Sequence, residues 1–292
     1  MKKYIPLFFL FIALLIISCD KVKNPQIIKN TAVGTTFVTK SNSSISNYKK
    51  VLLEDYTGHK CGNCPPAAVL AETLEAKYKD TLVVMAVHAG GFAKVHIPDY
   101  PASYTTTAGN DWDSNSGGGF AISFPAGNPN GMVNRTAYPG FALVHKDTWA
   151  TTVALAMKDP FIVKLDVTTN YDPTARALNT DIKATFKLTY TVNTKISVVL
   201  TEDSIIGSQT DYTLNPDLIP NYRFDNVLRG AINGSWGDIL KAAPIAISDS
   251  VKVSFPNVSV DPSFNDKKVS VLVFVYDETT KAVLQAEKVK IR

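Results

Sequence analysis

Apolar positions change their spacing twice along residues 51–87, and these changes predict a strand, a helix and a second strand. Residues 51–53 begin a buried strand that ends at Gly58. Apolar residues then recur at helical spacing across residues 65–79: Val69, Leu70, Leu74 and Tyr78. Residues 82–87 are continuously apolar, which is typical of a strand covered on both faces. Together these segments predict a βαβ unit with a right-handed crossover.

The pattern is different after Pro160, where apolar and polar residues alternate and few helical periods remain. Turn signals such as Asp172-Pro173 and Asp261-Pro262 separate many of the runs. Such short strands with a period of two predict a β-sandwich. The runs lie at residues 161–167, 182–190, 196–200, 251–255, 269–276 and 283–291.

Between these two regions, residues 89–128 are polar, aromatic and glycine-rich, with no strong period. A segment of this length predicts a functional insertion or short helices of its own. Residues 131–135 then predict a short strand, and residues 147–157 an amphipathic helix.

The first 19 residues resemble a bacterial lipoprotein signal. Lys2 and Lys3 precede an apolar run that is too short for a comfortable membrane span and ends in Ser18-Cys19. The resemblance implies cleavage before Cys19, a signal peptide at residues 1–18 and lipidation of the Cys19 sulfur. An uncleaved anchor, or a secretory signal with an incidental cysteine, is the alternative. Residues 19–46 predict a tether after the lipidated cysteine, and residues 34–39 within it alternate weakly like an added edge strand.

Composition narrows the class of protein. Apolar residues make up 45% of the chain, which is enough for a globular protein with true cores. The formal charge is +4, or about +2 once Lys2 and Lys3 are removed, and the basic residues are scattered. This distribution argues against nucleic-acid binding.

Candidate chemistry is concentrated in Cys61-Gly62-Asn63-Cys64, at the junction of the predicted strand and helix. One helical turn brings such a pair to the Cα separation of a disulfide. With Cys19 assigned to the signal, Cys61 and Cys64 are the only cysteines of the mature chain. A pair that can close on itself suits an oxidising compartment.

Residues 51–157 resemble a thioredoxin-fold domain. The resemblance rests on the Cys61–Cys64 junction, on Asp55 six residues before Cys61, and on a proline before a later strand. It implies that Cys61 is the nucleophile, Cys64 the resolving thiol and Asp55 the proton acceptor. It also implies a cis-proline facing the pair, for which Pro129 fits best and Pro125 is the second candidate.

The flanks of the pair depart from that family. Lys60, with His59 before it, replaces the usual aromatic residue; both can be positive and lower the Cys61 pKa, or be solvated loop residues. Pro65-Pro66 predicts that the helix begins near Cys64.

Two other interpretations of the candidate chemistry remain open. The pair can be an inert structural disulfide. It can also be half of a zinc site, for which only histidines are available as further ligands: His59, His88, His96 and His145. Asp111, Asp113 and Asn115 begin like a calcium loop, but Ser116 and Ile122 occupy its glycine and acidic positions. We expect no metal and no cofactor.

Taken together, these motifs resemble the 28-kilodalton outer-membrane-protein-related lipoproteins of Gram-negative bacteria. This resemblance rests on the lipoprotein signal, the cysteine pair and four further segments: residues 54–58, 132–135, 226–229 and 234–237. Asn134 and Arg135 can be functional or structural.

The expected fold is an α/β thioredoxin-like domain at residues 47–158, followed by an all-β immunoglobulin-like sandwich at residues 159–292. The expected function is thiol–disulfide exchange with protein thiols or disulfides in a lipid-anchored envelope protein. The alternative is a surface binding or adhesion lipoprotein, with an unidentified protein partner, whose disulfide is only structural.

Overall fold

The computed structural model describes residues 40–123 and 127–292. The expected signal peptide, Cys19, residues 34–39 and Pro125 lie outside the described residues. No helix within the described ranges is both long and apolar enough to cross a membrane.

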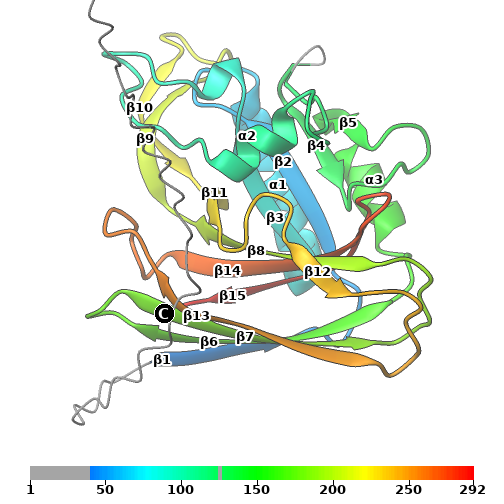
Figure 1. Ribbon diagram of the computed structural model, residues 1–292. Helices are drawn as coiled ribbons and strands as arrows, with labels where there is room; N and C mark the ends of the chain where they lie inside the picture. The colour runs from blue at the N-terminus through cyan, green and yellow to red at the C-terminus, as the bar shows by residue number, and fades with distance from the viewer. Residues whose placement is uncertain (1–39, 124–126) are drawn as a thin grey trace, which may run out of the picture. The chain divides into compact units, whose positions relative to one another are not determined.

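A four-stranded antiparallel sheet forms one layer of a β-sandwich (Figure 1). Its strands, in spatial order, are β1 (Lys40–Ile45), β6 (Val163–Asp172), β7 (Ala177–Phe186) and β13 (Ser250–Ser259). Residues 40–45 were expected in the tether, but β1 pairs along its full length with β6 and therefore belongs to the folded unit.

A nine-stranded sheet forms the facing layer and continues beyond the sandwich. Its order is β15-β14-β8-β11-β3-β2-β4-β5, and β12 pairs with β8. Its strands are β2 (Val51–Thr57), β3 (Leu82–His88), β4 (Asn130–Val133), β5 (Leu143–His145), β8 (Thr194–Glu202), β11 (Val227–Ala231), β12 (Asp238–Lys241), β14 (Val269–Asp277) and β15 (Val283–Lys290). Buried side chains from both layers, such as Val167, Ile182 and Val273, make one apolar cluster. The described chain is thus mostly β and contains the expected sandwich.

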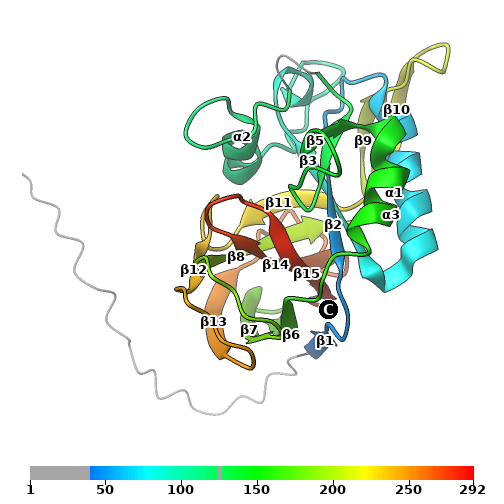
Figure 2. The same cartoon turned by 90° about the vertical axis from the view of Figure 1, so that its right-hand side faces the viewer.

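The βαβ unit lies at the other end of the large sheet. β2 and β3 pair in parallel and are connected through α1 (Cys64–Tyr78), while β4 is antiparallel to β2. The described chain also has α2 (Thr107–Asp113), α3 (Trp149–Ala156) and the short 3-10 turns η1 (Lys79–Thr81), η2 (Gly91–Ala93) and η3 (Lys146–Thr148). Helices α1 and α3 lie side by side on one face of the sheet (Figure 2), and α2 within the insertion covers the other. Every residue of β2 is buried because both faces are covered, including the charged residues Glu54 and Asp55.

β11 joins the two ends of the large sheet. It pairs antiparallel with β8 of the sandwich, and Val227 pairs in parallel with Ala86 of β3. Residues 38–292 form one compact unit. The nine-stranded sheet therefore contains strands from both sides of the boundary expected between residues 158 and 159.

The hairpin of β9 (Ile205–Thr210) and β10 (Leu218–Phe224) is a separate two-stranded sheet. We call residues 205–224 the covering hairpin, because its tip lies against the loop that carries Cys61. Its strands have few buried apolar positions, which is why the alternation of the sequence does not reveal them.

Candidate functional site

The cysteine pair lies where β2 leads into α1. Cys61 and Cys64 form a disulfide with a Cα–Cα distance of 5.4 Å. The Cys61 amide donates to the Gly58 carbonyl at 2.9 Å, and the Cys64 amide donates to the Cys61 carbonyl at 3.1 Å. α1 begins at Cys64 with prolines in its first turn, as predicted, so Cys61 precedes the helix.

The covering hairpin shields this disulfide from solvent. The Thr210 amide donates to the His59 carbonyl at 2.9 Å, and the Tyr212 amide donates to the Gly62 carbonyl at 3.0 Å. The Gln209 side chain donates to the Cys61 carbonyl at 3.0 Å. Two of these three bonds join backbone amides to backbone carbonyls, as in the pairing of an added strand. Both cysteines are only 2% exposed as a result.

Tyr212 closes the cover over Gly62. A side chain at Gly62 would collide with the Tyr212 ring, so the two segments are in direct contact.

We expect Tyr212→Ala to speed reduction of the disulfide by dithiothreitol about tenfold, because losing roughly 1.4 kcal/mol of ring contact favours local opening. Quenching the reaction at successive times and labelling the free thiols measures this rate. Phe141→Ala, at another exposed aromatic residue, is the control; equal rates in the two variants would contradict a shielding role.

Asp55 lies beneath the pair on β2. Its carboxyl group is 3% exposed, and its Oδ1 atom has no hydrogen-bond partner among the described residues. Burial raises the pKa of Asp55 to about 7. Asp55 and Cys64 line the same small cavity of about 40 Å³, which has room for about two or three water molecules. The carboxyl group can therefore exchange a proton near neutral pH beside Cys64.

His59 differs from both of its expected roles. It is 1% exposed, so it is not a solvated loop residue. Its ring stacks on Tyr100 with centroids 5.2 Å apart, and its Nε2 donates to the Lys94 carbonyl at 3.1 Å. Desolvation lowers the pKa of His59 despite that bond. The imidazole is therefore neutral near pH 7 and does not supply a positive charge to Cys61. Lys60 is half-buried, and its amide donates to the Phe92 carbonyl.

His88 is a buried group that sequence reasoning assigned only to a zinc alternative. It lines the cavity with Asp55 and Cys64, and neither ring nitrogen has a partner among the described residues. Burial lowers the pKa of His88 to about 3, so the ring is neutral. The sequence signal for it is weak: a single histidine closing the apolar run of β3.

Pro129 lies at the start of β4, and the Asn128–Pro129 peptide bond is cis. A surface groove of about 440 Å³ is lined by Asn63 and Pro66 from the cysteine loop and α1, and by Pro129. The structure thus brings together Cys61, Cys64, Asp55 and the groove beside Pro129, although the covering hairpin occupies one side of the cysteine loop.

Asn134 and Arg135 have structural contacts. The Arg135 guanidinium donates to both Glu54 carboxylate oxygens, at 2.8 and 2.7 Å, and both side chains are almost fully buried. Asn134 exchanges hydrogen bonds with the Leu52 backbone through its amide and its Oδ1 atom. Of the two interpretations, the structural one fits these contacts.

Comparison with known proteins adds the family. The model of the family described as outer membrane protein Omp28 matches residues 124–292, which is more than half of the chain. The chain belongs to the Omp28 family. The matched region includes Pro129, Arg135 and the covering hairpin, whereas Cys61 and Cys64 precede it. The description of this family places the protein in the cell envelope, at the outer membrane.

Two solved structures are similar to this Omp28-family chain. A protein of Agrobacterium tumefaciens is 12% identical with a TM-score of 0.48, covering 85% of this chain and 96% of its own. A domain of the outer membrane lipoprotein Omp28 from Porphyromonas gingivalis is 18% identical with a TM-score of 0.29, covering 46% of this chain and 91% of its own. No curated protein matches the sequence.

Proposed function

We propose that this Omp28-family protein is a thiol–disulfide oxidoreductase of the envelope. Its substrates are protein thiols or disulfides, and it acts through a thioredoxin-like site beside an immunoglobulin-like sandwich. We further propose that residues 1–18 are a cleaved signal peptide and that lipid is attached at Cys19. The redox proposal rests on the environment of Asp55. This residue shares a small cavity with Cys64, and its pKa is raised to about 7.

The proposed exchange uses Cys61 as the nucleophile. In the reduced protein, the Cys61 thiolate attacks a partner disulfide, forming a mixed disulfide and releasing one partner thiolate. Cys64 then loses its proton to Asp55, and its thiolate attacks the Cys61 sulfur. That step expels the second partner thiolate, so the partner is reduced to two thiols while the Cys61–Cys64 disulfide forms. The reverse sequence oxidises a partner dithiol.

Partner access requires the covering hairpin to move. Bonds from Gln209, Thr210 and Tyr212 occupy the carbonyls of the cysteine loop. The groove along Asn63, Pro66 and Pro129 remains open, and we propose that it accepts an extended segment of the partner, with Pro129 facing the pair.

The second candidate function is a binding or adhesion lipoprotein with an inert disulfide. The observation that favours it is the 2% exposure of both cysteines, because exchange requires an accessible sulfur. The two functions make opposite demands on the pair: reversible reduction in the first, and resistance to reductant in the folded protein in the second.

Reduction potential and mixed-disulfide trapping distinguish the two functions. We expect Cys64→Ser to accumulate a mixed disulfide through Cys61 with a protein substrate, because the resolving thiol is missing. Cys61→Ser is the matched control and should trap much less. We also expect a potential above about −300 mV, the level below which structural disulfides lie. A lower potential, with no exchange on any protein substrate, would leave the structural interpretation.

A further inference from the structure

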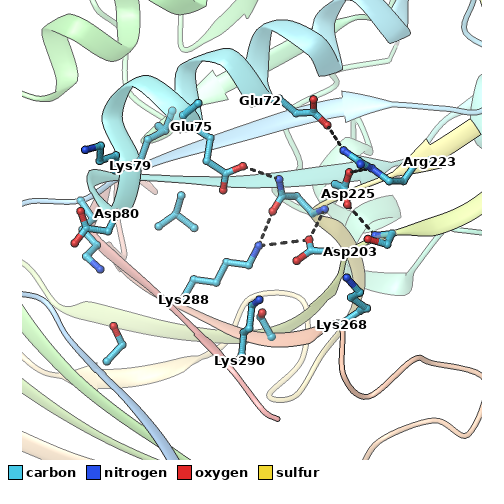
Figure 3. A pocket seen from close by; sticks show the side chains of 18 of the residues that line it. Glu72, Glu75, Lys79, Asp80, Asp203, Arg223, Asp225, Lys268, Lys288 and Lys290 are labelled. Carbon is cyan, nitrogen blue, oxygen red and sulfur yellow. Dashed lines mark hydrogen bonds and ion pairs between the residues drawn. The ribbon is translucent and has the colours of Figure 1, made fainter.

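A large open pocket, which neither Cys61 nor Cys64 lines, lies between α1 and the sandwich. Its volume is about 820 Å³, within the range of small-molecule sites. Residues of α1 and the start of β3 form one side of it, and residues near the ends of β14 and β15 form the other (Figure 3). None of the interpretations of the sequence assigns a role to this surface.

Acidic side chains in the pocket already have protein donors. Each carboxylate accepts at least one hydrogen bond from a neighbour: Glu72 from Arg223, Asp225 from Arg223 and the Ser204 amide, Asp203 from the Asn226 amide, Glu75 from the Asn226 side chain, and Asp80 from Tyr48. Each carboxylate of this pocket thus has at least one donor within the protein.

Three of the five lysines that line the pocket lie near the ends of β14 and β15. Figure 3 shows the side chains of Lys268, Lys288 and Lys290 on the same side of the pocket, opposite α1. Among the described residues, the ammonium groups of Lys268 and Lys290 have neither an ion pair nor a hydrogen bond. Lys288 donates to the Asn226 Oδ1 atom at 2.5 Å and lies 3.8 Å from Asp203. This side of the pocket therefore presents unused donors and positive charge, and over the whole lining six cationic side chains exceed five carboxylates by one charge.

Asn226 holds this arrangement in place from the floor of the pocket. It is 7% exposed and adopts a left-handed backbone conformation with φ of 59°. Its side chain connects Glu75 on α1 to Lys288 on β15. A buried amide fixed by a partner on either side gives Lys288 a defined position, which reduces the entropy lost when a ligand binds.

We propose that this pocket binds a small organic anion of the phosphate class through Lys268, Lys288 and Lys290. Lysine binds phosphate as a point charge with several donors, and three ammonium groups on one side of the pocket offer it charge and donors for its oxygens. The exposed Ile45 side chain at the rim contacts the non-polar part of the ligand. Binding is independent of the redox state of Cys61 and Cys64, and it weakens as salt increases because the lysines are solvent-accessible.

Calorimetric titration of residues 38–292, the compact unit, tests this site. The probes are inorganic phosphate, glycerol 3-phosphate and monomeric dihexanoyl phosphatidylglycerol, with glycerol as the uncharged control. We expect saturable binding of the phosphates and none of glycerol. Phosphatidylglycerol binding at least tenfold tighter than glycerol 3-phosphate would assign a lipid headgroup, and equal binding a free organic phosphate.

Matched charge variants decide whether the three lysines form the site. Lys268→Gln/Lys288→Gln/Lys290→Gln should weaken phosphate binding about tenfold or more, which corresponds to at least 1.4 kcal/mol. The control removes the same charge elsewhere: Lys183→Gln/Lys187→Gln/Lys252→Gln, three exposed lysines that do not line the pocket. If the first variant does not fold, Lys268→Gln/Lys290→Gln replaces it, since both side chains are exposed. Equal affinity of the two variants, or no saturable binding up to about 10 mM, would overturn the proposal.

Discussion

Arg135→Met is expected to destabilise the folded protein by about 3–5 kcal/mol, because it leaves the Glu54 carboxylate buried without its partner. Both side chains of this pair are at most 1% exposed. The guanidinium also lies about 5 Å from the rings of Trp112, Phe120 and Phe274, so the change removes cation–π contacts as well. Urea denaturation followed by circular dichroism measures the loss, and the melting temperature should fall by about 10 °C.

Two controls separate this effect from a simple loss of charge. The double variant Glu54→Leu/Arg135→Met should recover most of the stability, because no charge remains buried. Arg223→Met removes an arginine whose side chain is 60% exposed while it contacts Glu72 and Asp225, and should cost less than about 1 kcal/mol. Similar losses for Arg135→Met and Arg223→Met would contradict a buried, essential pair.

Asp55→Asn is expected to alter the pH dependence of stability. The folded pKa of about 7 lies above the ordinary value of 3.8. Between these values the folded state binds a proton that the unfolded state lacks. The contribution of Asp55 is therefore fully present below about pH 4 and is lost as the pH rises to 7. From about pH 4 to pH 7, the free energy of unfolding of Asp55→Asn should therefore rise relative to that of the wild type by about 4 kcal/mol. This corresponds to about three pKa units at roughly 1.4 kcal/mol each.

Denaturation of both proteins at pH 4, 6 and 8 measures that change. The asparagine amide has its own unmet hydrogen bonds, which cost about 1–3 kcal/mol at every pH, so the slope is the informative quantity. Asp99→Asn, at an exposed aspartate, should follow the wild-type slope. Parallel curves for wild type and Asp55→Asn would show that Asp55 titrates normally.

Those parts of the fold that bury a regular stripe could be predicted from the sequence. Residues 82–88 are buried and almost uniformly apolar, and the buried strand β2 opens with the apolar residues 51–53. Strand β6 alternates between buried and partly exposed positions along its length, as its sequence does. In both cases the spacing of apolar residues matches the buried positions, because a whole face of the strand packs against other elements.

Elements defined by pairing rather than by apolar burial could not be predicted. β1 is a polar strand whose backbone pairing with β6 holds it, and the strands of the covering hairpin expose much of their length. β11 connects to β3 through a single residue pair, Val227 with Ala86. Such contacts depend on partners more than a hundred residues away, which no local period records.

For the candidate site, the spacing predicted that Cys61 and Cys64 lie at disulfide distance, and the structure forms this disulfide across the turn that precedes α1. The surroundings of the pair required the structure. His59 has a polar side chain, yet Tyr100 and the Lys94 carbonyl hold it in a buried position. The cover contributed by Gln209 and Tyr212 lies about 150 residues beyond the cysteines along the chain.

The shared nine-stranded sheet limits how this protein can be divided, either by evolution or at the bench. Residues 124–292, which define family membership, include β4 but lack β2, the strand between β4 and β3. Expressed alone, that region would leave open edges on β4 and on β11, where unpaired backbone groups promote aggregation. The family-matched region, residues 124–292, is therefore smaller than the region that must fold as one unit. That larger region begins no later than β1.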